Sequence, residues 1–230
     1  MPKKVLIFSG AGISAESGIR TFRDANGLWE EYNVEEVCSI EGFERNPQLV
    51  NRFYDARRHD LRYRLPNAAH EMVARLKIKY RNRIEVLTQN VDDLFERAGC
   101  PGVIHLHGTL TQLRCMDCGC VFDIGYDSQE GAVCPECESD SIRHNVVMFG
   151  ENAPMYQKLQ DAIDDCDYLV VIGTSGQVIN IAFYAPYFEE SILNNLDKDE
   201  SFDSFFTTVY YEKATSAAAK IEADIERFLS

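Results

Sequence analysis

A short apolar run that ends in a glycine-rich turn lies close to the start of the chain and most narrows the choice of fold. Residues 5–8 read VLIF and are followed by Ser9 and Gly10. Such a run is typical of an inner strand of a parallel sheet. Residues 10–15 read GAGISA and fit G-x-G-x-x-(G/A), in which missing side chains let backbone N–H groups approach a pyrophosphate. A glycine turn after a strand is also common without any phosphate, so other motifs must decide.

The stretch after this turn departs from an ordinary dinucleotide-binding unit. Residues 14–27 are too polar and too rich in glycine for a long amphipathic helix, and they predict a short helix followed by a loop that folds over a ligand. The string GAGISAESGIRTFRDANGLW, residues 10–29, resembles the first signature of the sirtuins, the NAD-dependent protein-lysine deacylases. The resemblance implies NAD contacts from Gly10, Ala11, Gly12, Ile13, Ser14, Glu16, Phe22, Arg23 and Trp29.

Composition limits the class of protein and its partners. With 230 residues, 45% of them hydrophobic, the chain can bury one good core and carry a smaller module beside it. A formal charge of −14 argues against nucleic acid, because phosphate contacts need a basic face, and favours a basic or neutral protein partner. No apolar run reaches the roughly 18 residues of a membrane helix, and residues 1–4 are too few for a signal peptide. We therefore expect a cytoplasmic protein.

Four of the eight cysteines form two C-x-x-C pairs. The full spacing is C-x₂-C-x₁₅-C-x₂-C, which indicates a tetrahedral zinc site in a reducing compartment. Four thiolates leave no position for water, so one structural Zn²⁺ is expected to tie residues 113–143 into a small ribbon. Cys120 competes for the register, but the paired spacing favours the ligands Cys115, Cys118, Cys134 and Cys137.

Polar residues follow two further apolar runs. Residues 84–87 lead to Gln89, Asn90 and Asp92, and residues 168–172 lead to a second glycine-rich turn. Since ligand groups gather at the carboxyl ends of parallel strands, both sets are expected at one edge of the sheet. A polar helix cap at Asn90 or Asp92 is the simpler alternative, and both roles can hold together.

Roles for these residues come from the family resemblance. It places Gln89, Asn90 and Asp92 of the T-Q-N-x-D signature in the nicotinamide and ribose pocket, with Asn90 and Asp92 also catalytic. It makes His107 of the H-G motif the general base and His105 a structural neighbour. A histidine pKa near neutrality suits removal of a proton from a ribose hydroxyl. By the same resemblance, further NAD contacts are Gly173, Thr174 and Ser175.

A tyrosine and an arginine lie three residues apart in a segment that is expected to be helical. Tyr54 and Arg57 lie on one face of a helix expected after Pro47, whereas Arg58 lies on another face and is left out. Without context they are a packing aromatic and a solvated arginine. In the sirtuins that this chain most resembles, such a pair binds the carboxylate of succinyl-, malonyl- or glutaryl-lysine, which suits a guanidinium and a phenol.

The segment V-V-x-F-G-E is the family's substrate-binding stretch. In residues 146–151 it implies that the backbone lines the acyl-lysine tunnel and pairs with an extended peptide by β-augmentation. The contacts expected here are Val147, Phe149 and Gly150.

The resemblance weakens beyond residue 178. The proline that sirtuins usually have shortly after the G-T-S segment is missing from residues 179–182. The asparagine that holds the adenosine ribose is expected at Asn195, although Asn194 is equally well placed in the sequence. A backbone contact to adenine near Ala214 or Thr215 is a further expectation.

The predicted fold is α/β, a Rossmann-like parallel sheet with helices on both faces plus a small zinc-ribbon and helical domain. Residues 1–30, 66–112 and 144–230 form the NAD-binding domain. The helical insert 31–65 and the zinc ribbon 113–143 form the small domain. Substrate and NAD are expected to meet in the cleft between them.

The implied activity is transfer of an acyl group from protein lysine to ADP-ribose, with NAD as co-substrate and nicotinamide released. Acetyl and acidic acyl groups are both expected substrates. Phe22 is expected to shield the reactive sugar, and Arg23 to hold the cofactor loop. The alternatives are a mono-ADP-ribosyltransferase on the same NAD site and a non-enzymatic NAD-sensing or zinc-ribbon module. Acylated lysines of proteins are the expected partners, without nucleic acid or membrane, and we expect a monomer.

Overall fold

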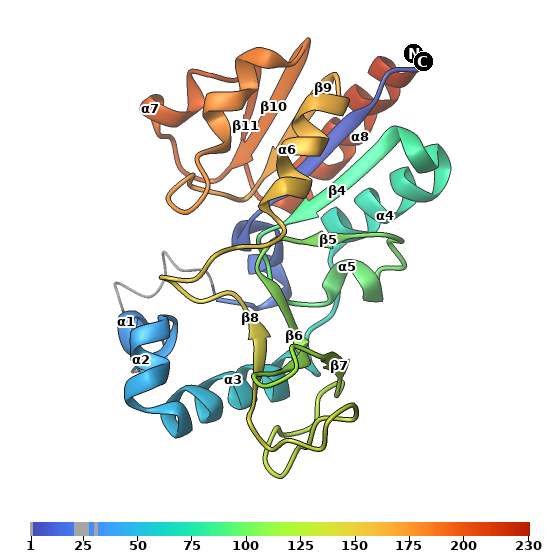
Figure 1. Cartoon of the computed structure of the whole chain (residues 1–230). Helices are drawn as coiled ribbons and strands as arrows, with labels where there is room; N and C mark the ends of the chain where they lie inside the picture. Colours follow the sequence, from blue (N-terminus) through green and yellow to red (C-terminus); the bar gives the residue numbers. More distant parts are fainter. Residues whose placement is uncertain (1, 21–27, 30–31) are drawn as a thin grey trace.

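A six-stranded parallel sheet forms the centre of the larger domain. The computed structural model describes residues 2–20, 28–29 and 32–230. In these residues the strand order is β11-β10-β9-β1-β4-β5 (Figure 1). Strands β4 and β5 lie in chain order on one side of β1. Strands β9, β10 and β11 lie in chain order on its other side. The strands are β1 (Val5–Ser9), β4 (Ile84–Thr88), β5 (Ile104–His105), β9 (Tyr168–Ile172), β10 (Glu190–Asn195) and β11 (Thr208–Tyr211).

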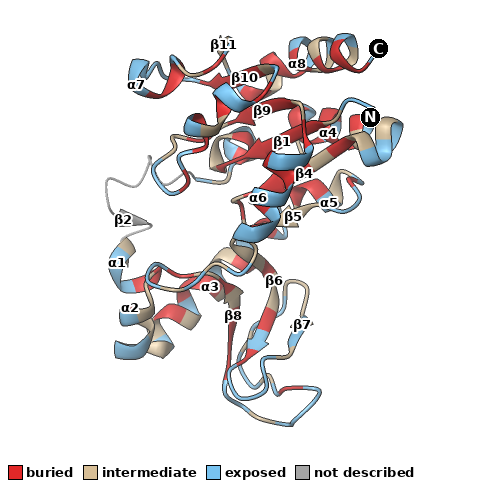
Figure 2. Cartoon of the chain, turned by 45° about the horizontal axis from the view of Figure 1, so that its top comes forward, coloured by how far each residue is buried: buried red, intermediate tan, exposed pale blue. Residues whose placement is uncertain are grey.

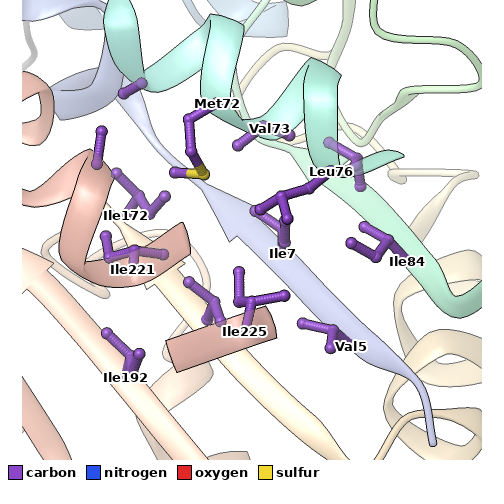
Figure 3. Packing of buried hydrophobic residues seen from close by; sticks show 14 of the residues in the cluster. Val5, Ile7, Met72, Val73, Leu76, Ile84, Ile172, Ile192, Ile221 and Ile225 are labelled. Carbon is purple, nitrogen blue, oxygen red and sulfur yellow. The ribbon is translucent and has the colours of Figure 1, made fainter. Parts of the chain in front are cut away.

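Alternate residues of the inner strands supply two hydrophobic cores. Val5 and Ile7 face helices α4 (Ala68–Tyr80) and α8 (Ala214–Leu229), as Figure 3 shows. Leu6 and Phe8 face the opposite side, which is covered by α6 (Tyr156–Asp165) and the 3₁₀ helix η4 (Ile181–Tyr187). Each such side chain stabilises the fold by about 1.5–3 kcal/mol. The predicted sheet with helices on both faces is therefore confirmed.

Asparagine side chains cap the first turns of two helices. The Asn46 side chain accepts a hydrogen bond from Leu49 N, and Pro47 opens helix α3 (Pro47–Leu61). The Asn67 side chain accepts one from Ala69 N at 2.9 Å and so caps α4. The start of α3 at Pro47 therefore lies where the sequence predicts a helix.

The small domain combines helices with a second sheet. Three helices, α1 (Val34–Val37), α2 (Ile40–Arg45) and α3, pack against an antiparallel sheet of order β7-β6-β8. Its strands are β6 (Gly108–Cys115), β7 (Val121–Asp123) and β8 (Ile142–Val146), so the sheet extends beyond the expected ribbon 113–143 on both sides. Figure 2 shows that the loops at its far end are largely exposed. A core of four buried residues supports that end: Leu113, Cys115, Cys134 and Ile142.

Arg58 joins the two parts of the small domain. Its side chain is fully buried and donates to the carbonyls of Leu110 and Asp127, pairs with Asp55, and contacts Nδ1 of His144. A buried guanidinium is tolerated only when its donors are satisfied in this way. Arg58 is therefore a structural link between α3 and the antiparallel sheet of β6, β7 and β8.

Short elements complete the chain. They are the pair β2 (Leu28–Trp29) and β3 (Tyr32–Asn33), the helices α5 (Leu94–Arg97) and α7 (Glu200–Asp203), and the 3₁₀ helices η1 (Ala11–Ser17) and η3 (Arg81–Arg83). Within the described part of the chain, no helix has the length and apolar character needed to cross a membrane.

Candidate active site

The glycine-rich turn is held against the end of β9. Gly10 N–H donates to Ile172 O at 3.0 Å, and Gly12 N–H donates to Gly173 O at 2.9 Å. A Cβ on Gly12 would lie 2.6 Å from the Cα of Gly173, closer than a side chain allows. The turn therefore lies at the switch point between β1 and β9, where the chain order of the strands reverses and where α/β sheets bind ligands.

A buried polar network positions the predicted ribose-pocket residues. Ser14 Oγ donates to Asp92 Oδ2 at 3.0 Å and accepts from Asn90 Nδ2 at 3.1 Å. Burial raises the pKa of Asp92, and the hydrogen bonds from Leu94 N and Ser14 oppose that rise. Tertiary structure thus brings the first turn and the T-Q-N-x-D segment into direct contact.

His70 is the structural partner of this network. Its Nδ1 accepts from Asn67 N at 3.3 Å, so the ring proton is on Nε2, which lies 3.3 Å from Ser14 Oγ. Burial lowers the pKa of His70 to about 4, and the imidazole is therefore neutral near pH 7. These contacts make His70 a buried, hydrogen-bonded structural residue and not a base.

Thr174 connects the second glycine turn with two neighbouring segments. Its Oγ1 accepts from Gln89 Nε2 at 3.1 Å, and its carbonyl accepts from Asn195 Nδ2 at 2.8 Å. The amide of Asn194 instead donates to the carbonyls of Tyr210 and Glu212. Of the two asparagines, Asn195 is therefore the one directed toward the Gly173 turn.

His107 lies between β5 and β6 with both ring nitrogens hydrogen-bonded. Nδ1–H donates to Gln89 O at 3.0 Å, and Nε2 lies 3.0 Å from the Tyr156 hydroxyl. Burial lowers the pKa of His107, so the ring is neutral and can accept a proton near pH 7. The sequence contained no signal for Tyr156, which opens α6.

His105 has a different environment. Its Nδ1–H donates to Asn90 O at 2.8 Å, and its Nε2 lies 3.0 Å from Glu96 Oε1. Both nitrogens are engaged with protein groups, as expected for a residue that supports the Asn90 turn.

A cavity of about 550 Å³ contains most of the predicted reactive and substrate residues. One part of its wall comes from the ends of β1 and β4 and from His107, and another comes from the small domain. The predicted residues that line it are Ala11, Gln89, Asn90, Asp92, His107, Tyr54, Arg57, Val147, Phe149 and Gly150. The structure therefore brings the proposed base and the proposed acyl pocket into one space.

Tyr54 is fixed by aromatic contacts from α3 and β8. It is buried, and its ring lies 5.1 Å from the His144 ring and 5.1 Å from the Phe53 ring. The Arg57 guanidinium lies 5.5 Å from the centre of the Phe53 ring. Burial raises the pKa of Tyr54 well above its usual value, so the phenol keeps its proton as a hydrogen-bond donor.

The backbone of Phe149 is already paired within the chain. Phe149 N–H donates to Cys38 O at 2.8 Å, and Phe149 O accepts from Ile40 N–H at 3.0 Å. Its side chain is 48% exposed beside the cavity. A peptide therefore cannot add a strand through the Phe149 amide and carbonyl without displacing residues 38–40.

Glu16 differs from the other residues of the first signature. Its carboxylate accepts from Thr215 N at 3.0 Å and from Thr215 Oγ1 at 2.8 Å, at the start of α8. Phe22 and Arg23 lie outside the described residues. Trp29 is described only as part of strand β2. The structure therefore leaves the predicted roles of these three residues as predictions.

The four predicted zinc ligands converge at the far end of the small domain. Their sulfur atoms lie within 4.8 Å of one another, with Cys115 to Cys137 at 3.6 Å and Cys118 to Cys134 at 3.5 Å. Zn–S bonds of about 2.3 Å place tetrahedral sulfur atoms about 3.8 Å apart, so this donor set fits Zn²⁺. Cys120 is outside the group, which supports the predicted register.

Comparisons with known proteins agree with this site. The chain matches the Sir2 family over residues 10–180. It is 50% identical over 227 residues to a Campylobacter jejuni protein named NAD-dependent protein deacylase, covering 99% of this chain and 97% of that protein.

Solved structures show the same similarity. A Sir2 homologue in complex with NAD is 32% identical with a TM-score of 0.85, covering 99% of this chain and 91% of that one. A Sir2 complex with a deacetylated p53 peptide and 3′-O-acetyl ADP-ribose is 29% identical with a TM-score of 0.79, covering 96% and 93%.

Proposed function

The chain belongs to the Sir2 family, and we propose that it is an NAD-dependent protein-lysine deacylase that transfers the acyl group to ADP-ribose. The observation that carries the proposal is the position of His107, a neutral, half-buried imidazole in the same cavity as Asn90, Asp92 and the Tyr54–Arg57 pair. A base, a polar ribose pocket and an acyl-binding wall are the parts that this reaction needs.

The proposed reaction has two steps. In the first, Asn90 and Asp92 hold the nicotinamide ribose while the acyl oxygen of the substrate attacks its anomeric carbon and nicotinamide leaves. In the second, His107 removes a proton from a ribose hydroxyl, and the resulting oxygen attacks the acyl carbon. Lysine then leaves with a proton, and attack of one water molecule on the acyl carbon, which now bridges two ribose oxygens, gives O-acyl-ADP-ribose. Among the NAD contacts we propose, Gly10 and Gly12 serve the pyrophosphate, while Thr174 and Asn195 serve the adenosine side.

We further propose that acidic acyl groups are preferred substrates. Arg57 and Tyr54 line the same cavity as His107. A guanidinium pairs with a carboxylate through two hydrogen bonds, and the protonated phenol of Tyr54 adds a third. Succinyl- or malonyl-lysine would thus gain contacts that acetyl-lysine cannot make.

Paired peptides test both proposals. NAD-dependent release of lysine is measured from acetyl- and succinyl-peptides with the wild type and with Arg57→Met. We expect the variant to lose succinyl release by at least about tenfold, the size of one lost charged pair, and to keep acetyl release. Arg52→Met, an exposed arginine on the same helix α3, is the matched control and should leave both activities unchanged.

The same assay separates the proposed activity from its alternatives. Wild-type enzyme that labels a protein from NAD and forms no acyl-ADP-ribose would be a mono-ADP-ribosyltransferase. Wild-type enzyme that binds NAD and processes neither peptide would be a binding module. We propose that the reaction takes place in the cytoplasm, because none of the eight cysteines, all within the described residues, forms a disulfide and a reducing compartment keeps the four proposed zinc ligands available to the metal.

A further inference from the structure

Tyr156 stands between two hollows of the molecule. It is the first residue of α6 and lines the active-site cavity. It also lines an adjoining hollow of about 440 Å³, whose other walls include Leu159, Ile163 and Phe183. The centre of its ring lies 5.9 Å from that of His107. The side chain therefore contacts the proposed base and borders both hollows.

The direction of the hydrogen bond between Tyr156 and His107 follows from the other ring nitrogen. Nδ1 of His107 faces the carbonyl of Gln89 at 3.0 Å, and a carbonyl only accepts, so the ring proton is on Nδ1. Nε2 then has only a lone pair, and Tyr156 must donate to it across 3.0 Å. Burial raises the pKa of Tyr156, which keeps this donor protonated near pH 7.

This contact occupies the atom that the proposed reaction requires. A ribose hydroxyl must give its proton to Nε2 of His107, and an imidazole nitrogen has one lone pair. The ribose hydroxyl and Tyr156 therefore cannot both donate directly to it. Insertion of the ribose hydroxyl into the existing hydrogen bond resolves the conflict, because each hydroxyl still donates in the same direction. This insertion requires the Tyr156 hydroxyl to move away from Nε2 by up to about 2.7 Å, one O–H···O distance, and the second hollow that Tyr156 lines is the space proposed to take up that movement.

We propose, on the basis of the deacylation proposed above, that Tyr156 is a catalytic residue whose hydroxyl donates to the ribose oxygen from which His107 takes the proton. In this step the ribose O–H bond breaks and an N–H bond forms at Nε2, which becomes imidazolium. The electron pair left on the ribose oxygen forms a bond to the acyl carbon, the π bond between that carbon and the lysine nitrogen breaks with its electrons going to nitrogen, and Tyr156 keeps its own proton. A donor aimed at an oxygen that gains negative charge stabilises the transition state more than the ground state.

The test compares the two chemical steps in Tyr156→Phe. Formation of acyl-ADP-ribose reports the second step, which uses the ribose hydroxyl. Exchange of labelled nicotinamide into NAD in the presence of acyl-peptide reports the first step and its reversal, which do not. We expect acyl-ADP-ribose formation to fall about tenfold to a hundredfold, as for a hydrogen bond to a charged group, and the exchange to stay within about twofold of the wild type. Tyr187→Phe removes a phenol that is 80% exposed on η4 and should change neither rate.

Each outcome decides the proposal. Unchanged or faster acyl-ADP-ribose formation in Tyr156→Phe would overturn the proposal. The Tyr156 hydroxyl would then occupy Nε2 of His107 in the unliganded protein without assisting the reaction. An equal fall in both rates would also overturn it, because the side chain would then act by supporting the fold. Failure of the wild type in both assays would instead reject the proposed deacylation and can be told apart from either result. The Nε2 chemical shift of His107, assigned with His107→Asn, should change in unliganded Tyr156→Phe and so report the hydrogen bond directly.

Discussion

Gly12 and Gly173 meet across the switch point of the sheet, with the N–H of Gly12 donating to the carbonyl of Gly173 at 2.9 Å. They lie far apart in the sequence, one after β1 and the other after β9. The absence of side chains thus serves two ends, close packing of the two turns and access for a phosphate. Of these two roles, the structure shows the close packing of the two turns directly.

Gly12→Ala should separate the two turns. The new Cβ would lie 2.6 Å from Gly173 Cα and 2.9 Å from Gly173 O, and neither backbone atom can move without its strand. We expect NAD affinity measured by calorimetry to fall at least about tenfold and the unfolding free energy to fall by about 1–3 kcal/mol, the usual cost of overpacking.

Gly102→Ala is the control for this variant. Gly102 has φ +67°, which strains an alanine, but its Cβ would meet nothing within 4 Å. It should lose some stability and keep NAD affinity. Equal NAD affinity in Gly12→Ala and the wild type would contradict the steric explanation.

Zinc should hold the small domain together. Cys137→Ser removes one of four converging sulfur ligands, so we expect less than one zinc per chain by elemental analysis and a lower midpoint of thermal unfolding. Cys120→Ser should retain one zinc per chain, because Cys120 lies outside the cluster. Loss of zinc in Cys120→Ser with retention in Cys137→Ser would show that the register is different.

His107→Ala should abolish formation of acyl-ADP-ribose and leave the fold intact. The side chain makes two hydrogen bonds beside the cavity, and its loss removes the proposed base for the second step. Nicotinamide exchange, which precedes proton removal, should persist, and the thermal midpoint should stay close to that of the wild type. Wild-type turnover in this variant would remove His107 from the mechanism.

The rate of acyl-ADP-ribose formation should stay high at a lower pH than it would if the base were an exposed histidine. Because burial lowers the pKa of His107, the base stays deprotonated as the pH falls below 6.5. The acid limb of the rate of acyl-ADP-ribose formation should therefore have an apparent pKa below 6.5. A limb at or above 6.5 would contradict this assignment.

His144 should make stability depend on pH. Burial, with a smaller contribution from Arg58, lowers the pKa of His144 to about 3. The unfolded state therefore takes up a proton below about pH 6.5 while the folded state stays neutral. Stability is then full above pH 6.5 and declines as the pH falls toward 3.

Urea unfolding between pH 6.5 and 5 measures this effect in His144→Gln and the wild type. Well below pH 6.5, one such histidine contributes a slope of up to about 1.4 kcal/mol per pH unit. The variant should lose that part of the slope, whatever its absolute stability. Parallel pH profiles for the two proteins would show that His144 takes up its proton in the folded state.

The sequence by itself determined the fold class and most residues around the cavity. Buried strands such as residues 5–9 read as continuous apolar runs because both of their faces are covered. The zinc ligands could be read from their spacing because a tetrahedral ion needs paired cysteines on tight turns. The resemblance to a known family supplied the expected roles of His107, Asn90 and Asp92. The structure brings all three side chains into one cavity.

Tertiary structure alone decided which residues touch. Glu16 accepts hydrogen bonds from Thr215 at the start of α8, Arg58 is buried between α3 and the strands β6 and β8, and Tyr156 is hydrogen-bonded to His107. Each of these contacts joins segments that are distant in the chain. Local periodicity and motif spacing report only neighbours in sequence, because helix and strand geometry fixes relations over a few residues. Contacts between distant elements depend on how the sheets and helices pack, and only the folded chain shows them.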